Sequence, residues 1–275
     1  MTQIKKAIIP VAGWGTRRLP VTKVIEKCMI PVGNRPIIDY NVQDCLKAGI
    51  DEIIFVVGEQ STQIREYYRS NISLNDYLKR NGKEAYLPMV APLKGVKLHF
   101  IVQPSYGKYG TAVPVALASE YVNPGESVLV VMGDDFFYNK DDSSETARLI
   151  EAVPEGQSGI LGAVLADDDV ITGRYGSIEE DEQGNLVRVV ERPDIMPNPF
   201  VKNVAKYVLN YEMLTSVKEY VENESVNGEY YIFTPFEKLI EQGQTMKVVR
   251  AKGQFLDGGT VEGWLYANNV VLAHE

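Results

Sequence analysis

The residues with the clearest chemical content form a glycine-rich, cationic loop near the start of the chain. An apolar run is followed by the sequence AGWGTR over positions 12–17. Gly13 and Gly15 allow backbone N–H groups to approach anionic oxygens, and Arg17 and Lys27 add positive charge. The pattern predicts a phosphate-binding loop, and the alternative is a tight strand-to-loop turn.

The spacing of this loop excludes two familiar phosphate-binding motifs. A dinucleotide fingerprint needs a glycine three residues after Gly15, where Arg18 stands. A P-loop needs Gly-Lys-Ser/Thr after four intervening residues, and that sequence is absent. We therefore expect neither a nicotinamide-dependent enzyme nor an ordinary P-loop ATPase.

Two aspartates stand at the ends of other apolar runs. Asp134 follows Gly133 after one run, and Asp257 precedes Gly258-Gly259 after another. Ligands of open parallel sheets lie beyond the carboxyl ends of the strands, and Mg²⁺ is commonly held there by one or two carboxylates together with substrate phosphates. Asp134 and Asp257 are the candidate Mg²⁺ ligands, unless they only cap turns.

A third polar position follows a further strand. Gln103 follows that strand, and Gly110 and Thr111 stand where a helix is expected to begin. A glutamine offers both a donor and an acceptor to a nucleobase edge, and a glycine lets a flat ring lie against the backbone. The alternative is an ordinary turn and helix start.

The elements that must position these residues alternate between strands and helices. A helical pattern begins at Pro36 and ends near Gly49. Unbroken apolar segments are typical of strands covered on both faces; they span 7–11, 52–57, 96–102, 127–132 and 159–165. We predict an α/β fold, with one doubly wound, mainly parallel mixed sheet flanked by helices, and a single domain over residues 1–275.

Composition narrows the function further. The chain has 275 residues, 45% of them hydrophobic, and a net charge of −9 with no Lys/Arg-rich block, which disfavours nucleic acid as a partner. Two cysteines and two histidines form neither a disulfide framework nor a metal-ligand pattern. No apolar run is long enough to span a bilayer, so we expect no membrane partner and a cytoplasmic location. The acidic runs 167–169 and 179–182 are interpreted as solvated loops, the second within a hairpin turn.

Several motifs occur in an order that resembles one family. They are Val11 to Arg17, Lys27 before Met29-Ile30-Pro31-Val32, Arg35-Pro36-Ile37-Ile38, Gly133-Asp134, Val190-Glu191-Arg192-Pro193 and Asp257-Gly258-Gly259-Thr260. This series resembles the signature of sugar-1-phosphate nucleotidylyltransferases. Within them it is most similar to the bacterial UTP–glucose-1-phosphate uridylyltransferases, because residues 65–92 resemble the helical insertion of those enzymes.

The resemblance implies a Rossmann-like nucleotidyltransferase fold and a role for each matching position. Nucleotide contacts would come from Ala12, Gly13, Gly15, Thr16, Gln103, Gly110 and Thr111, with Arg17 on the triphosphate and Lys27 at the reacting centre. Sugar contacts would come from Tyr175, Gly176, Glu191, Asn203 and Glu229, with Arg192 on the sugar phosphate. Asp134 and Asp257 would hold Mg²⁺. The implied reaction converts UTP and glucose 1-phosphate to UDP-glucose and pyrophosphate, in a homodimer or homotetramer.

The sequence departs from the family pattern at four places. Cys28 replaces a glutamate, Lys108 a glycine and Arg192 a lysine, and Tyr230-Tyr231 replaces a more polar pair. Two alternatives therefore stay open: a nucleotidylyltransferase for another nucleotide or sugar phosphate, and a non-catalytic homologue that binds nucleotide-sugar. The apolar stripe of the C-terminal helical segment 261–273 predicts either a subunit contact or packing on the chain's own sheet.

Overall fold

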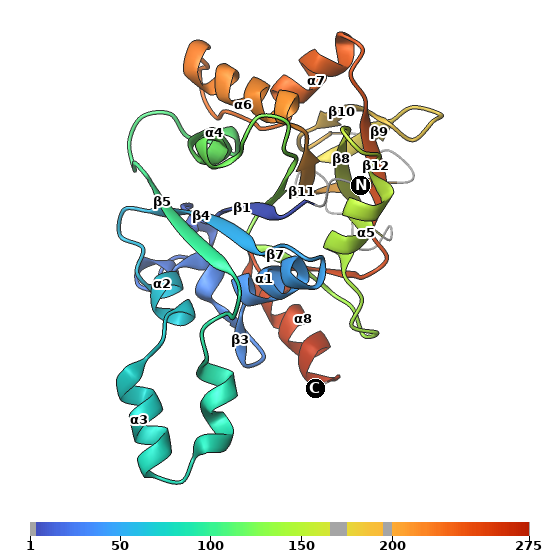
Figure 1. Cartoon of the computed structure of the whole chain (residues 1–275). Helices are drawn as coiled ribbons and strands as arrows, with labels where there is room; N and C mark the ends of the chain where they lie inside the picture. Colours follow the sequence, from blue (N-terminus) through green and yellow to red (C-terminus); the bar gives the residue numbers. More distant parts are fainter. Residues whose placement is uncertain (1–3, 166–174, 195–199, 275) are drawn as a thin grey trace.

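The core of the molecule is a nine-stranded mixed sheet (Figure 1). The computed structural model describes residues 4–165, 175–194 and 200–274, so the predicted acidic loop at 167–169 lies outside the described residues. Four neighbouring strands, in the order β6-β1-β4-β5, run parallel. Their bounds are Val128–Val131 for β6, Lys6–Pro10 for β1, Glu52–Gly58 for β4 and Lys97–Gln103 for β5.

The other half of the sheet brings in antiparallel pairs through β11. This strand pairs with β6, β8 and β9 in antiparallel fashion, while β12 runs parallel to β8 and β10 forms a hairpin with β9. The bounds are β8 Ser158–Val164, β9 Ser177–Glu180, β10 Leu186–Val190, β11 Val201–Leu209 and β12 Met246–Arg250. The predicted α/β class, with a mixed sheet and flanking helices, is confirmed.

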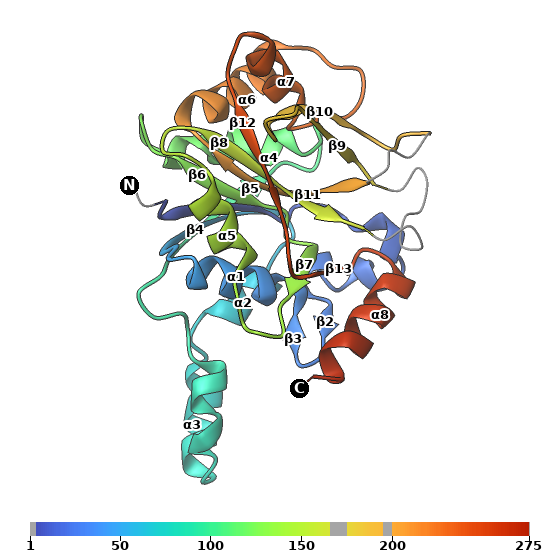
Figure 2. The same cartoon turned by 90° about the vertical axis from the view of Figure 1, so that its right-hand side faces the viewer.

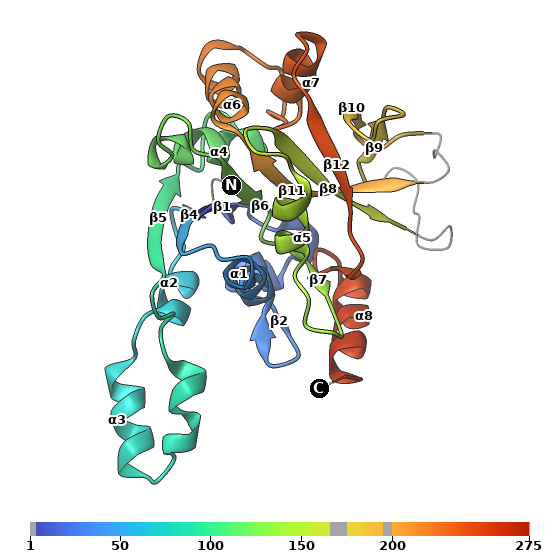
Figure 3. The same cartoon turned by 45° about the vertical axis from the view of Figure 1, so that its right-hand side comes forward.

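Helices cover both faces of the sheet because successive side chains of the buried strands point to opposite sides. Ile8 and Ile54 belong to the apolar cluster beneath α4, α6 and α7, whereas Ile9 and Phe55 pack on the side of α1 and α5. Figures 1 and 3 show these two helical layers. The bounds are α1 Ile37–Lys47, α4 Ala112–Ala118, α5 Glu145–Ala152, α6 Tyr211–Asn223 and α7 Thr234–Glu241.

A small ribbon layer lies beside the main sheet and carries the C-terminal helix α8, Val261–Leu272 (Figure 2). It consists of β7 paired with β13 and of β2 paired with β3; the bounds are β2 Pro31–Val32, β3 Arg35–Pro36, β7 Asp135–Tyr138 and β13 Gln254–Asp257. Ala267 and Val271 are buried in its core, and Trp264 packs against it and donates its indole N–H to the Pro31 carbonyl at 2.7 Å. The apolar stripe of the C-terminal helix thus packs on its own chain.

A helical arm projects from the body of the molecule in all three views (Figures 1, 2 and 3). It contains α2 Gln63–Tyr68, α3 Ile72–Arg80 and the 3-10 segment Glu84–Val90. These elements occupy the stretch predicted as a helical insertion at 65–92. Among the described residues, none of the helices combines the length and the apolar character needed to cross a membrane.

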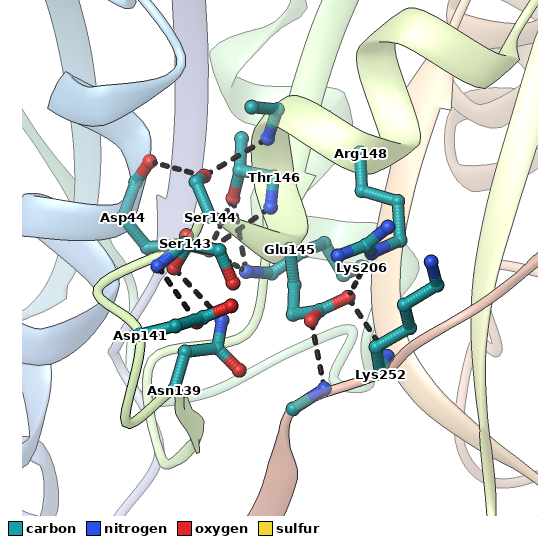
Figure 4. Close-up of polar contacts among 12 residues, drawn as sticks. Asp44, Asn139, Asp141, Ser143, Ser144, Glu145, Thr146, Arg148, Lys206 and Lys252 are labelled. Atoms are coloured by element: carbon teal, nitrogen blue, oxygen red, sulfur yellow. Dashed lines mark hydrogen bonds and ion pairs between the residues drawn. The ribbon is translucent and has the colours of Figure 1, made fainter.

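A buried ion pair joins the sheet to the helices on one face (Figure 4). Lys206 of β11 is 3% exposed, and its Nζ lies 2.6 Å from Asp44 Oδ2 on α1. The same carboxylate oxygen accepts hydrogen bonds from the backbone N–H and the hydroxyl of Thr146. Burial acts to raise the pKa of Asp44, but the Lys206 ammonium and these hydrogen bonds outweigh it, and the pKa lies below its ordinary value.

We expect this pair to make stability dependent on pH. Because the pKa of Asp44 is lower in the folded state, its contribution is present above the unfolded value of about 4 and is lost as pH falls through the folded value. Asp44→Asn should reduce the free energy of unfolding at pH 7 by roughly 3 kcal/mol, since it leaves the buried Lys206 ammonium without its anion. Urea unfolding at pH 7 and pH 3 should show that this reduction in the free energy of unfolding is smaller at pH 3. The exposed Asp76→Asn variant is the control, and a deficit for Asp44→Asn that is the same at both pH values would contradict the assignment.

Candidate active site

Three of the predicted site segments meet at one edge of the sheet. The loop 12–17 follows β1, Gln103 ends β5, and Gly133-Asp134 follows β6. Because β6, β1, β4 and β5 are parallel, their carboxyl ends lie along the same edge. Half-buried Gln103 lies opposite Gly58 in the ladder, and the Ala12 carbonyl is within 3.5 Å of the Cβ position of Gly58.

The glycine-rich loop is held against the segment that carries Lys27. Gly15 has a left-handed φ of 64°, and a Cβ there would meet Lys27 Cβ and a Thr22 methyl at 3.0 Å. The Thr22 hydroxyl donates to the Gly15 carbonyl at 2.9 Å. A Cβ at Gly13 would have no neighbouring atom within 4 Å, and Thr16, which is exposed, begins a 3-10 turn. The loop is thus both closely packed at Gly15 and open to a ligand at Gly13.

The predicted cations and aspartates come together at the end of this loop. Lys27 Nζ forms an ion pair with Asp134 Oδ2. The backbone N–H of Gly259 donates to Asp257 Oδ1 at 2.7 Å, and the position of a Cβ on Gly259 lies 3.4 Å from Lys27 Nζ and 3.5 Å from an Arg17 terminal nitrogen. Arg17, Lys27, Asp134 and Asp257 therefore form one charged cluster.

A third carboxylate belongs to this cluster. The antiparallel register of β7 and β13 places Asp135 directly opposite Asp257. Burial raises the pKa of Asp135 to about 8, with Lys202 opposing that rise and the neighbouring aspartates adding to it. Burial also acts to raise the pKa of Asp257, but Lys202 and the Gly259 N–H outweigh it and lower that pKa to about 2. Burial and the surrounding charges thus move the pKa values of Asp135 and Asp257 in opposite directions.

The ammonium of Lys27 stays charged in this setting. Burial acts to lower the pKa of Lys27, but the carboxylates of Asp134 and Asp135 outweigh it and raise that pKa. The same ion pair lowers the pKa of Asp134 against the effect of its own burial. The cluster thus presents a fixed cation and ionised carboxylates at the edge where the loop opens.

The donor set fits a magnesium ion that is shared with a substrate. Asp134 and Asp257 offer hard carboxylate oxygens, which Mg²⁺ prefers. In the part of the chain that the structure describes, no group of three His, Cys, Asp or Glu side chains could hold a metal by itself. Such a site suits Mg²⁺ because that ion is usually bound by one or two carboxylates together with substrate phosphates and water.

Lys202 is a site residue that the sequence did not reveal. It lies on β11 with 3% exposure, its Nζ 3.7 Å from Asp135 Oδ2, 3.8 Å from the ring centroid of Tyr175 and 3.3 Å from that of Phe255. It is one of two buried lysines within β11, so only its neighbours distinguish it. Asp135 carried a signal, since it adjoins Asp134 after the same strand, but the sequence did not show that it would lie opposite Asp257 in a ribbon.

The predicted sugar residues form a second group next to the carboxylates. A Cβ at Gly176 would lie 2.6 Å from Glu191 Oε1, so only glycine permits this approach. Burial raises the pKa of Glu191, and Glu229 adds to the rise while Arg192 opposes it, which places these three side chains in one electrostatic environment. Arg192 itself is exposed and has a left-handed φ of 48°.

Tyr175 and Asn203 connect this group to the rest of the site. The Tyr175 hydroxyl donates to Asp257 Oδ2 at 3.0 Å. The backbone N–H of Asn203 donates to the Gly176 carbonyl at 2.9 Å. The Asn203 side chain accepts from the Ala205 N–H and hydrogen-bonds the Tyr207 hydroxyl, so it braces the irregular part of β11.

The segment at Gly110 is fastened to the chain around Tyr230. Tyr230 N–H donates to the Tyr109 carbonyl, and the Tyr230 carbonyl accepts from the Ala112 N–H, both at 2.9 Å. The Thr111 hydroxyl accepts from the Ile232 N–H at 3.0 Å. These bonds fix the start of α4 next to the segment that carries Glu229, and so place the predicted nucleobase and sugar residues side by side.

Two departures from the family pattern have structural roles. Lys108 hydrogen-bonds the Val221 carbonyl at the end of α6 and lies 5.3 Å from the Tyr230 ring centroid. A lysine at that place stabilises the carbonyl end of a helix. Cys28 is buried in the apolar core, where burial raises the pKa of its thiol.

We expect Gly110→Ala to destabilise the protein strongly. Gly110 has a φ of 122°, and a Cβ there would lie 2.5 Å from both the N and the O of Tyr230. Strain of this kind typically costs about 1–3 kcal/mol before the steric clash is added. Gly107→Ala is the matched control, because Gly107 has a φ of 99° but open space around its Cβ position. Thermal unfolding of both variants should show the larger fall for Gly110→Ala; equal falls would mean that the Tyr230 contact is unimportant.

Comparison with known proteins defines the class. The family model "Nucleotidyl transferase" matches residues 6–274. The chain belongs to this nucleotidyl transferase family. A UTP–glucose-1-phosphate uridylyltransferase of Pseudomonas aeruginosa is 29% identical over 279 aligned positions, which cover 98% of this chain and 97% of that protein. A UTP–glucose-1-phosphate uridylyltransferase 2 of Streptococcus pyogenes is 30% identical over 96% of this chain and 89% of its own length.

Solved structures of such enzymes are also similar to this chain in fold. The UTP-bound UGPase of Acinetobacter baumannii superposes with a TM-score of 0.83 at 25% identity, covering 98% of this chain and 93% of that one. A UDP-glucose pyrophosphorylase complexed with UDP-glucose has the same fold, with a TM-score of 0.79 at 22% identity, covering 99% of this chain and all of the other.

Proposed function

We propose that this protein transfers a uridylyl group from UTP to glucose 1-phosphate, forming UDP-glucose and pyrophosphate. The observation that carries the proposal is the meeting of Arg17 and Lys27 with Asp134 and Asp257, beside a group formed by Glu191, Arg192 and Glu229. A polyanion and a sugar phosphate would thus lie next to each other. The names of the relatives support UTP and glucose 1-phosphate as the substrates.

In the proposed reaction an oxygen of glucose 1-phosphate attacks the α-phosphorus of UTP, and the bond to the β-phosphate breaks. The attacking phosphate is largely ionised near neutral pH, so the site needs no general base. The main obstacle is repulsion between two polyanions, and Arg17, Lys27 and Arg192 would offset it while aligning the reacting groups. When bound at Asp134 and Asp257, Mg²⁺ would supply further charge stabilisation at the phosphate oxygens.

The remaining groups bind and orient the substrates. The open backbone at Gly13 and the loop residues Ala12, Gly15 and Thr16 would contact the phosphates and ribose. Gln103 and the start of α4 at Gly110-Thr111 would face the uracil. Tyr175, Gly176, Glu191, Asn203 and Glu229 would line the glucose. We also propose, from the family resemblance, a cytoplasmic homodimer or homotetramer.

The test is pyrophosphate release from UTP, dTTP, CTP, ATP and GTP, each with glucose 1-phosphate and with or without Mg²⁺. Release that prefers UTP and needs both the sugar phosphate and the metal is the expected result. If release is fastest with a different nucleotide, the proposed class of reaction stands, and that nucleotide replaces UTP as the substrate. Binding of UDP-glucose without turnover of any nucleotide would point instead to a non-catalytic homologue.

A further inference from the structure

A cavity of about 350 Å³ opens at the far end of the ribbon that carries Asp135 and Asp257. Tyr138 and Gln254 pair at this end of the ribbon, and both line the cavity. Three residue steps separate them from the Asp135–Asp257 pair, which is about 10 Å along a strand. The cavity is therefore separate from the candidate active site.

Among the described residues that line this cavity, three of the four charged ones are cations. They are Lys140 from the turn after β7, Arg148 from α5 and Lys252 from the loop before β13, and the fourth is Asp141. Arg148 also forms an ion pair with the buried carboxylate of Glu145. Asp141 Oδ1 accepts a hydrogen bond from the Ser143 N–H at 3.1 Å. The chain as a whole has a net charge of −9, and its overall field does not favour anions. The cavity differs from this background because three cations from three separate segments line it.

A buried glutamate holds Arg148 and the backbone at Lys252 in place (Figure 4). The Glu145 side chain is fully buried and accepts hydrogen bonds from Arg148 Nε at 3.0 Å and from the backbone N–H groups of Gly253 at 2.8 Å and Lys252 at 3.2 Å. The bond from Arg148 uses Nε, and the other N–H donors of a guanidinium are on its terminal nitrogens. A Cβ on Gly253 would lie 1.8 Å from Asn139 Oδ1, so a side chain there would displace the Asn139 amide. The wall that carries Arg148 and Lys252 is therefore fixed before any ligand arrives.

We propose that this cavity binds a small phosphorylated anion of the size of a sugar phosphate. A guanidinium and two ammonium groups are the usual partners of phosphoryl oxygens. Tyr138, Asn139 and Gln254 add polar groups that suit hydroxyls. The volume lies in the range of small-ligand pockets, near its lower end, and so favours a single phosphorylated sugar over a nucleotide-sugar.

The test is calorimetric titration of inorganic phosphate and of glucose 6-phosphate into the full-length protein, without nucleotide or Mg²⁺. Lys140→Gln combined with Lys252→Gln removes two of the cations and keeps the bond from the Lys252 backbone to Glu145. Lys79→Gln combined with Lys94→Gln makes the same charge change at exposed positions of the arm and the segment after it. Arg192→Ala weakens the proposed sugar-phosphate subsite.

At least one probe should bind the unchanged protein, the Lys79/Lys94 variant and Arg192→Ala alike, and should bind the Lys140/Lys252 variant roughly tenfold or more weakly. Tighter binding of glucose 6-phosphate than of phosphate assigns the site to a sugar phosphate, and the reverse assigns it to the inorganic ion. Absence of binding by both probes would overturn the proposal. So would loss of binding in Arg192→Ala together with full binding in the Lys140/Lys252 variant, a result that would at the same time support the proposed active site.

Discussion

Lys27→Ala should lower the turnover number for pyrophosphate release from UTP and glucose 1-phosphate by roughly a hundredfold or more, because a preorganised charge of this kind contributes about 3 kcal/mol to the transition state. The structure gives the reason that Lys27 is preorganised. Its side chain is 13% exposed, it is paired with Asp134, and the first carbons of that side chain lie against the closely packed Gly15 turn. The ammonium therefore needs little rearrangement when a triphosphate binds.

The matched control is Lys23→Ala, which removes an exposed lysine from the same loop. We expect it to change the turnover number by less than about threefold, as an exposed charge contributes little. Thermal unfolding would show whether Lys27→Ala remains folded. A folded Lys27→Ala protein with an unchanged turnover number would show that Lys27 takes no part in the reaction.

Asp134→Asn should remove most of the response of activity to Mg²⁺. The substitution keeps the shape of the side chain but removes the charge that pairs with Lys27 and, in our proposal, binds the metal. We expect activity at least roughly a hundredfold lower across the Mg²⁺ titration. Binding of Mn²⁺ in the presence of UTP, followed by electron paramagnetic resonance, gives a second readout that does not depend on turnover.

Asp142→Asn serves as the control for this variant. Its carboxylate is 88% exposed and pairs with Lys47 on the surface, and its left-handed backbone suits asparagine. It should leave both the Mg²⁺ response and Mn²⁺ binding unchanged. If Asp134→Asn gave the same metal titration as the unchanged protein, Asp134 would not be a ligand.

The sequence indicated the fold because local patterns and tertiary structure agree in the parallel half of the sheet. A strand that is covered on both faces needs a continuous apolar run. The runs at 7–11, 52–57 and 127–132 correspond to β1, β4 and β6. The polar residues after these runs could be expected at one edge, since parallel strands share their carboxyl end. The hairpin between β9 and β10 was likewise visible from its turn, in which Asp181 accepts from the N–H groups of Gln183 and Asn185.

The sequence could not separate structural from chemical roles where one residue type serves both. Trp264 and its stripe fitted either a subunit contact or internal packing, and the packing against β2 and β13 appears only in three dimensions. In the sequence, Lys108 was a departure from the family pattern in the predicted nucleobase-binding turn. In the structure, its ammonium hydrogen-bonds the end of α6. Contacts between distant segments, such as those of Lys108 with Val221 and of Trp264 with Pro31, determine such roles.

By itself, the sequence determined the α/β class, the glycine-rich loop after β1 and the aspartates at strand ends, because each depends on short-range periodicity or on a residue's place after a strand. Only the tertiary structure brought Asp135 and Lys202 into the site, since the register of β7 with β13 and the neighbours of β11 decide which side chains meet. It also decided that the pKa of Asp135 rises while that of Asp257 falls. The pKa of an aspartate depends on its burial and on the charges around it, and neither follows from its position in the chain.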